Sequence, residues 1–287
     1  MPLQPFAGAD VPDLTIRALG TQVRARGAGA FEALGEVQRL ERLLTRFAPS
    51  PLTRLNESGE LHDPPPELVA ALRHALTVAR ETRGWVTPTV LPALEAAGYA
   101  RWPGDGAGEA ALAVPDTAGI LVRDDLLRLP PGVRLDLGGT AKGWIAWRAA
   151  RHLRGPGLVD AGGDLHLRLT APTTLGIETP AGAPAFVELP AGVHGVATSS
   201  VLRRAWPGGH HLIDPRQGRS ARTRFAQVTA VAGDVRTAET LAKLALLDTG
   251  EALEEALARH PGALLLAFGA SGEARERQRG QWVRWAA

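Results

Sequence analysis

The chain has 287 residues, of which 45% are hydrophobic and 22% are charged, a composition typical of a globular protein long enough to bury a packed core. The formal net charge is only +2, and the basic residues are interleaved with acidic ones, which argues against nucleic acid as a partner. The sequence contains no cysteine, which excludes disulfides, thiolate chemistry and a lipid-anchored cysteine.

Apolar periodicity and turn residues predict the elements along the chain. Helices are expected over residues 31–47, 67–83, 141–153, 236–247 and 251–259, and strands over 119–122, 126–129, 133–137, 158–160, 164–169 and 263–268. Residues 99–118, rich in Gly, Ala, Pro and Asp, are expected to form an irregular connection. Helices and strands are mixed without strict alternation, which predicts an α+β fold with mixed layers around central sheets.

The length of the chain and its apolar runs bear on domains and location. We expect one domain over residues 1–287, with two lobes meeting near residues 120–135 as the alternative. The sequence shows no signal-peptide pattern and no apolar run of about 18 residues. We therefore expect a cytoplasmic protein without membrane insertion, or an exported one if a leader has been removed.

The segment from Leu135 to Gly143 gives the strongest local signal of a ligand site. Two glycines at the start of a predicted helix let backbone amides approach an anion, and Asp136 and Lys142 bracket this turn. The alternative is a tight connection without a ligand. Lys142 and Lys243 are also the only lysines among 32 Lys and Arg residues, which indicates positions where Arg does not fit, unless the bias arose by chance.

Two further segments carry residues suited to catalysis or binding. His211 and Asp214, ahead of a Pro and a Gly turn, can form an acid/base pair at the mouth of a loop. The alternative is a solvated turn in which Asp214 makes an Asx-type contact and the histidine lies at the surface. Asp160 and Asp164 flank a glycine pair, which is equally typical of a β-turn and of a binding loop.

Taken in order, these segments resemble the ApbE family, the FAD:protein FMN transferases, from about Leu19 to Gly250. The resemblance rests on short motifs at residues 19–21, 44–56, 88–89, 136–143, 158–165, 197–199 and 211–218. It implies a protein that binds FAD, transfers FMN to a Ser or Thr hydroxyl of an acceptor flavoprotein, and releases AMP. A nucleotide-binding enzyme with a chance glycine turn is the unrelated alternative.

The resemblance also assigns roles to residues. It implies His211 and Asp214 as the acid/base pair, Phe47 near the flavin, and the pyrophosphate near the turn between Asp136 and Lys142. Further cofactor-binding positions are expected at Leu19, Trp85, Val86, Thr87, Gly162, Gly163, Thr198, Ser199 and Lys243. A magnesium ion, with ligands at Gly139 and Glu239, is expected to bridge the phosphates.

The expected metal site departs from the family pattern. The family has Ala-Asp-Ala-Leu-Ala-Thr where this chain has Ala238 to Lys243, so that Glu239 replaces the Asp and Lys243 replaces the Thr. An ammonium has no acceptor and cannot ligate a metal. We hypothesise that Lys243, paired with Glu239, takes the place of the ion; the alternative is an ordinary solvent-facing i,i+4 salt bridge.

A second departure lies at Gly84–Thr89, where Val86 and Thr87 replace the family's Phe-Asp pair and Trp85 can fill some of the space. These departures leave three functions open. The chain can be a working FMN transferase, a catalytically impaired flavin-binding protein that acts as a carrier or regulator, or an FAD pyrophosphatase.

Overall fold

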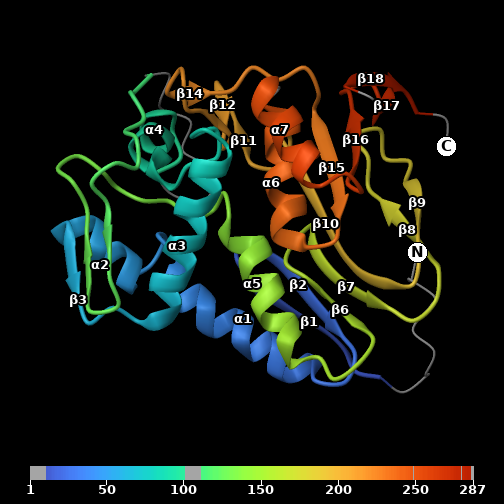
Figure 1. Cartoon of the computed structure of the whole chain (residues 1–287), viewed down its shortest axis with the longest axis horizontal. Helices are drawn as coiled ribbons and strands as arrows, with labels where there is room; N and C mark the ends of the chain where they lie inside the picture. The colour runs from blue at the N-terminus through green and yellow to red at the C-terminus, as the bar shows by residue number, and fades with distance from the viewer. Residues whose placement is uncertain (1–10, 101–110, 248, 279, 286–287) are drawn as a thin grey trace.

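The computed structural model of the chain describes residues 11–100, 111–247, 249–278 and 280–285 (Figure 1). The first ten residues, where a signal peptide would begin, lie outside these ranges, as does half of the connection predicted over residues 99–118. In the described part, no helix is both long enough and apolar enough to cross a membrane.

A nine-stranded sheet, in the order β1-β2-β6-β7-β10-β15-β16-β17-β18, forms the centre of the described structure. Each neighbouring pair is antiparallel. The strands are β1 (Asp13–Ala18), β2 (Thr21–Arg26), β6 (Gly157–Asp160), β7 (Asp164–Leu169), β10 (Gly192–Ser200), β15 (Gln227–Ala232), β16 (Leu264–Phe268), β17 (Ala274–Gln278) and β18 (Gln281–Arg284). This antiparallel sheet with its helices confirms the predicted α+β class.

Helices cover one face of this sheet, and Figure 1 shows α1, α5 and α6 in front of it. The helices are α1 (Ala30–Leu44), α2 (Pro51–Ser58), α3 (Pro66–Glu81), α4 (Leu91–Ala96), α5 (Ala141–Ala149), α6 (Val235–Leu246) and α7 (Glu251–Arg259), with the 3-10 turns η1 (Pro88–Val90) and η2 (Ala150–His152). α1 packs on β1 and β2, α5 on β6 and β7, and α6 on β10 and β15. The sheet is therefore buried on this side.

Smaller sheets surround the central one. They are formed by β3 (Glu60–His62), β5 (Leu126–Arg128) and β4 (Leu121–Val122); by β11 (Ala205–Trp206) and β12 (Gly209–His210); by β13 (Ile213–Asp214) and β14 (Arg219–Ser220); and by β8 (Thr173–Ile177) and β9 (Ala185–Leu189). The inward side chains of the β8–β9 hairpin share a hydrophobic cluster with Leu158, Leu167 and Phe268 of the central sheet. The hairpin therefore shares a core with the central sheet.

The predicted helices are all present, with ends shifted by a few residues. The stripe assigned to residues 31–47 is correct at Leu34, Val37 and Leu40, which are buried. It is wrong at its ends, because Phe31 is 77% exposed and Phe47, which lies beyond α1, is 49% exposed.

The predicted strand over residues 133–137 is wrong, although Leu135 and Leu137 are buried as a strand would require. A side chain takes the place of a neighbouring strand here. The Asn56 amide accepts a hydrogen bond from the Leu135 N–H at 2.7 Å and donates one to the Leu135 carbonyl at 2.9 Å. Asp136 N–H binds the Pro88 carbonyl at 2.8 Å. The backbone polar groups of this segment thus find hydrogen-bond partners in a side chain and a loop, and no pairing with a neighbouring strand is needed.

One tight turn and one close approach of the backbone shape the fold around the site. Leu19 and Gly20 form the two-residue turn between β1 and β2, and both have positive φ, as a type I′ hairpin turn requires. At Gly195 of β10, an added Cβ would lie 2.1 Å from the Val235 N atom. Glycine at this position lets the first turn of α6 rest directly on the sheet.

Candidate functional site

A cavity of about 1,140 Å³ opens among the elements that carry the predicted motifs. Its walls come from the β1–β2 turn, the loop after α1, the first turn of α5, the β6–β7 turn, the β8 strand, β10 and α6. This volume lies slightly above the range of about 300–1,000 Å³ that is usual for small-ligand pockets. It suits a dinucleotide-sized ligand.

Most of the residues predicted from the sequence meet at this cavity. Its lining includes Leu19, Phe47, Trp85, Val86, Thr87, Asp136, Gly139, Lys142, Gly162, Gly163, Thr198, Ser199, His211 and Lys243. Asp214 and Glu239, which were also predicted, occupy other positions, described below. The segments that carry the motifs are therefore neighbours in space as well as in the family pattern.

The glycine pair of the β6–β7 turn and Lys142 form one part of the cavity wall. Lys142 makes an ion pair with Asp164, whose side chain is only 2% exposed. Asp160 accepts a hydrogen bond from the Gly163 N–H at 2.8 Å, and burial raises the pKa of this carboxyl. Gly162 has a φ of +73°, and an added Cβ would lie 2.3 Å from the Thr21 side chain, so this turn requires glycine.

Lys243 and Glu239 of α6 form a second ion pair beside the first. The Lys243 ammonium lies 3.2 Å from Glu239 Oε1, and the two side chains are 10% and 1% exposed. Glu239 Oε2 accepts a hydrogen bond from the Gly143 N–H at 3.0 Å. Burial raises the pKa of Glu239, while the ammonium groups of Lys243 and Lys142 lower it. The pair is therefore enclosed, and the alternative of a solvent-facing salt bridge does not hold.

These residues do not fit a divalent metal ion. Magnesium takes oxygen ligands in an octahedral arrangement. Both oxygens of Glu239 already accept hydrogen bonds, and the neighbouring ammonium of Lys243 offers donors alone. Across the described ranges, no three His, Asp or Glu side chains gather in a way that could hold a metal. The metal ligands expected at Gly139 and Glu239 are thus not assembled into a site.

His211 lines the cavity, and its Nδ1 is sealed from solvent without a hydrogen-bond partner. Burial, together with the positive charges of Arg204, Lys142 and Lys243, lowers the pKa of His211 to about 3. The imidazole is therefore neutral at pH 7. The alternative of a histidine at the surface does not hold.

Asp214 is held in its own turn. Its carboxylate accepts hydrogen bonds from the Arg216 N–H at 2.8 Å and from the Gln217 side chain at 2.6 Å. This is the Asx-type arrangement that the sequence left open. Since His211 Nδ1 has no partner, the structure does not join the two residues in a hydrogen-bonded pair through that nitrogen.

An arginine and aromatic side chains surround another part of the cavity. Arg46 pairs with Asp136, and these side chains are 5% and 10% exposed. The guanidinium also donates to the Tyr99 carbonyl at 2.8 Å and lies 4.2 Å from the centroid of the Phe47 ring. Tyr99 in turn stacks on Trp206 at 5.3 Å. Phe47, half exposed beside this cluster, offers a face on which a planar ring can stack.

The glycine turn before α5 uses its amides differently from the sequence expectation. Gly138 N–H binds Asp136 Oδ1 at 2.6 Å, and the amides of Thr140 and Ala141 bind the Leu137 carbonyl. Gly143 N–H binds Glu239. These four amides are thus occupied within the chain, and the Lys142 side chain brings positive charge to the cavity wall.

Several cavity residues were not predicted. Arg46 lies within the motif at residues 44–56, and its position beside Phe47 was the available signal. Arg204 and Tyr99 also line the cavity, as do Leu175 and Ile177 of β8. The hairpin residues carry no motif, because their part in the wall follows from packing across the sheet.

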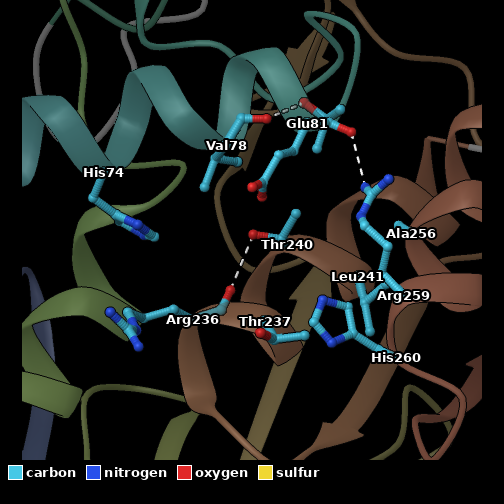
Figure 2. Close-up of a pocket in the computed structure, with 11 residues that line it drawn as sticks. His74, Val78, Glu81, Arg236, Thr237, Thr240, Leu241, Ala256, Arg259 and His260 are labelled. Carbon is cyan, nitrogen blue, oxygen red and sulfur yellow. Dashed lines mark hydrogen bonds between the residues drawn. The ribbon is translucent and has the colours of Figure 1, made fainter.

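A second, smaller hollow of about 120 Å³ lies between α3, α6 and the end of α7 (Figure 2). Its two arginines already have partners: Arg236 binds Asp234, and Arg259 donates to the Glu81 carbonyl at 3.0 Å. Burial and the nearby Arg236 lower the pKa of His74 to about 4. The hollow shares no predicted site residue with the large cavity.

Comparisons with known proteins agree with this geometry. A FAD:protein FMN transferase from Klebsiella pneumoniae (strain 342) is 33% identical over 114 residues, which are 36% of this chain and 35% of that protein. The crystal structure of the ApbE protein from Thermotoga maritima has a TM-score of 0.80 at 24% identity, covering 94% of this chain and 97% of that one. The flavin transferase ApbE from Vibrio cholerae has a TM-score of 0.72 at 21% identity, with the same coverage of each chain. These structures share the fold. The sequence profile of the ApbE family matches residues 15–266, and the chain belongs to that family.

Proposed function

We propose that this protein binds FAD in the large cavity and transfers its FMN moiety to a Ser or Thr hydroxyl of an acceptor protein, with release of AMP. The observation that carries the proposal is the meeting of His211, Lys142 and Lys243 at one cavity of dinucleotide size. The family and the Klebsiella relative support the same chemistry.

The reaction is a displacement at phosphorus. The acceptor oxygen forms a bond to the phosphorus of the FMN moiety, the bond from this phosphorus to the bridging oxygen breaks, and AMP leaves with that oxygen. Such a reaction needs cations beside the phosphates, a positioned hydroxyl and a base for its proton. Lys142 and Lys243 supply the cations, and Phe47 supplies a face on which the isoalloxazine or adenine ring can stack.

His211 is the residue suited to take the hydroxyl proton. Its imidazole is neutral at pH 7, since its pKa is lowered to about 3, but a base with so low a pKa is weak. The phosphates of bound FAD would raise this pKa by opposing the neighbouring cations. The base therefore gains strength when the substrate is in place. Asp214 has a supporting role, because its carboxylate holds the turn after β13.

The test is an incubation with FAD and an acceptor that carries a Ser/Thr flavinylation motif, with covalent flavin and AMP measured together. We expect the two products in equal amounts, and His211→Asn should lower the rate by about 100-fold or more while FAD still binds. Asp214→Asn is the matched control and should have the smaller effect. AMP and FMN without modified acceptor would identify a pyrophosphatase, and bound FAD without AMP would identify a flavin-binding protein; either result would refute the transferase.

A further inference from the structure

The ammonium of Lys243 has an unusual position in this molecule. It lines the large cavity, yet its side chain is only 10% exposed, and the carboxylate beside it is 1% exposed. A carboxylate so deeply buried needs a positive partner. Lys243 provides that partner and also presents its charge to the space where a ligand would lie.

Glu239 is fixed from two sides. Oε2 binds the Gly143 N–H at the start of α5, and Oε1 faces Lys243. An added Cβ on Gly143 would lie 2.7 Å from Oε2, so the approach of α5 to this carboxylate depends on glycine. The carboxylate is thus anchored between α5 and α6, and the ammonium is anchored to the carboxylate.

A divalent cation bound through Glu239 would meet an occupied carboxylate. It would share the oxygens with the hydrogen bonds from Gly143 and Lys243, and it would lie next to an ammonium of the same sign. Two positive charges in contact repel each other strongly in a partly buried site. The ammonium of Lys243 and a metal ion would therefore compete for the same position beside Glu239.

We propose that the Lys243 ammonium is the fixed cation that holds the pyrophosphate of FAD, and that FAD binding by this chain needs no divalent metal ion. The inference rests on the proposed binding of FAD, but not on transfer activity. Lys142, paired with Asp164 on the neighbouring wall, supplies the second cation. Two ammonium groups then lie beside the two phosphate charges, while each stays paired with its own carboxylate.

The first experiment measures FAD binding to the whole protein by isothermal titration calorimetry, once in EDTA and once in millimolar MgCl₂. We expect the two dissociation constants to agree within about twofold. Binding that tightens tenfold or more with magnesium would overturn the inference. A failure to bind FAD in either buffer would instead overturn the proposed function, so the two failures are distinguishable.

The second experiment removes the charge. Lys243→Met should weaken FAD about 10- to 100-fold, as expected for loss of a charge-assisted contact to phosphate, and should change riboflavin binding by less than about threefold. The double variant E239Q/K243M also removes the unpaired carboxylate, so it keeps the test valid if the single variant does not fold. Equal losses for FAD and riboflavin, or no loss for FAD, would refute the role assigned to Lys243.

Discussion

The ion pair between Arg46 and Asp136 should be a large contributor to the stability of the site, and a double-mutant cycle can measure it. The residues lie 90 positions apart in the sequence, so the pair fixes the loop after α1 to the turn before α5. Both side chains are at least nine-tenths buried. Asp136→Asn keeps the shape of the side chain and an acceptor for the Gly138 N–H, but it removes both the charge and the acceptor that face Arg46.

The magnitude follows from the partners that remain. Breaking a buried pair from one side costs about 3–5 kcal/mol. In D136N the guanidinium keeps its hydrogen bonds to the Tyr99 and Ala100 carbonyls, so we expect the lower end, about 3 kcal/mol. Arg46→Met should cost a similar amount, because the Asp136 carboxylate is left with one amide donor.

Urea unfolding of the ligand-free protein measures these free energies. The double variant should be less destabilised than the sum of the single variants by about 2 kcal/mol or more. The matched control is the more exposed pair of Asp13 and Arg24, with an N–O distance of 2.6 Å, where Asp13→Asn should cost less than about 1 kcal/mol. Additive costs in the cycle, or a D136N cost as small as that of D13N, would refute the reasoning.

Two further predictions concern the scaffold. Gly195→Ala should destabilise the protein by about 3 kcal/mol in urea unfolding, because the new Cβ would meet the Val235 backbone. Gly35→Ala in α1 is the control: its Cβ would have nothing within 4 Å, so it should stabilise the protein by about 0.5–1 kcal/mol. Equal effects of the two substitutions would contradict the close approach at Gly195. The pKa of His74 falls from 6.5 in the unfolded chain to about 4 in the folded one. The contribution of neutral His74 to the free energy of unfolding is therefore complete above pH 6.5 and is lost as the pH falls toward 4. His74→Gln should remove about 2 kcal/mol of the loss between pH 7 and pH 5, and unchanged pH dependence in this variant would show that His74 does not contribute.

The sequence predicted helices and strands well where a single repeat of apolar residues decides the element. The helix at Glu251–Arg259 and the strand at Asp164–Leu169 have the predicted bounds, because burial of one face and local turn residues decide both. The segment over residues 133–137 was predicted as a strand because its alternation is real. Its partner, however, is the Asn56 side chain, and no local pattern identifies a hydrogen-bond partner nearly eighty residues away.

The candidate site divides in a similar way. Motif order predicted its glycines, its lysines and His211, because the family resemblance fixes these positions together. It left open whether Asp214 caps its own turn, and it did not predict that β8 supplies part of the wall. The place of β8 depends on distances across the fold. Burial of the Lys243–Glu239 pair is of the same kind, since i,i+4 spacing is equally compatible with a solvent-facing pair.

The two lysines of this arginine-rich chain share one physical setting. Each places its ammonium at the wall of the large cavity, and each pairs with a carboxylate that is at most 2% exposed, Asp164 for Lys142 and Glu239 for Lys243. An ammonium is a compact charge with three donors, whereas a guanidinium is a planar fork with five donors that each require an acceptor. Beside a carboxylate whose other oxygen is already bound, as in Glu239, the compact ion leaves donors free to face the cavity. Arginine at position 243 would need more acceptors and more space, so lysine suits the geometry of a buried carboxylate next to the large cavity better than arginine does.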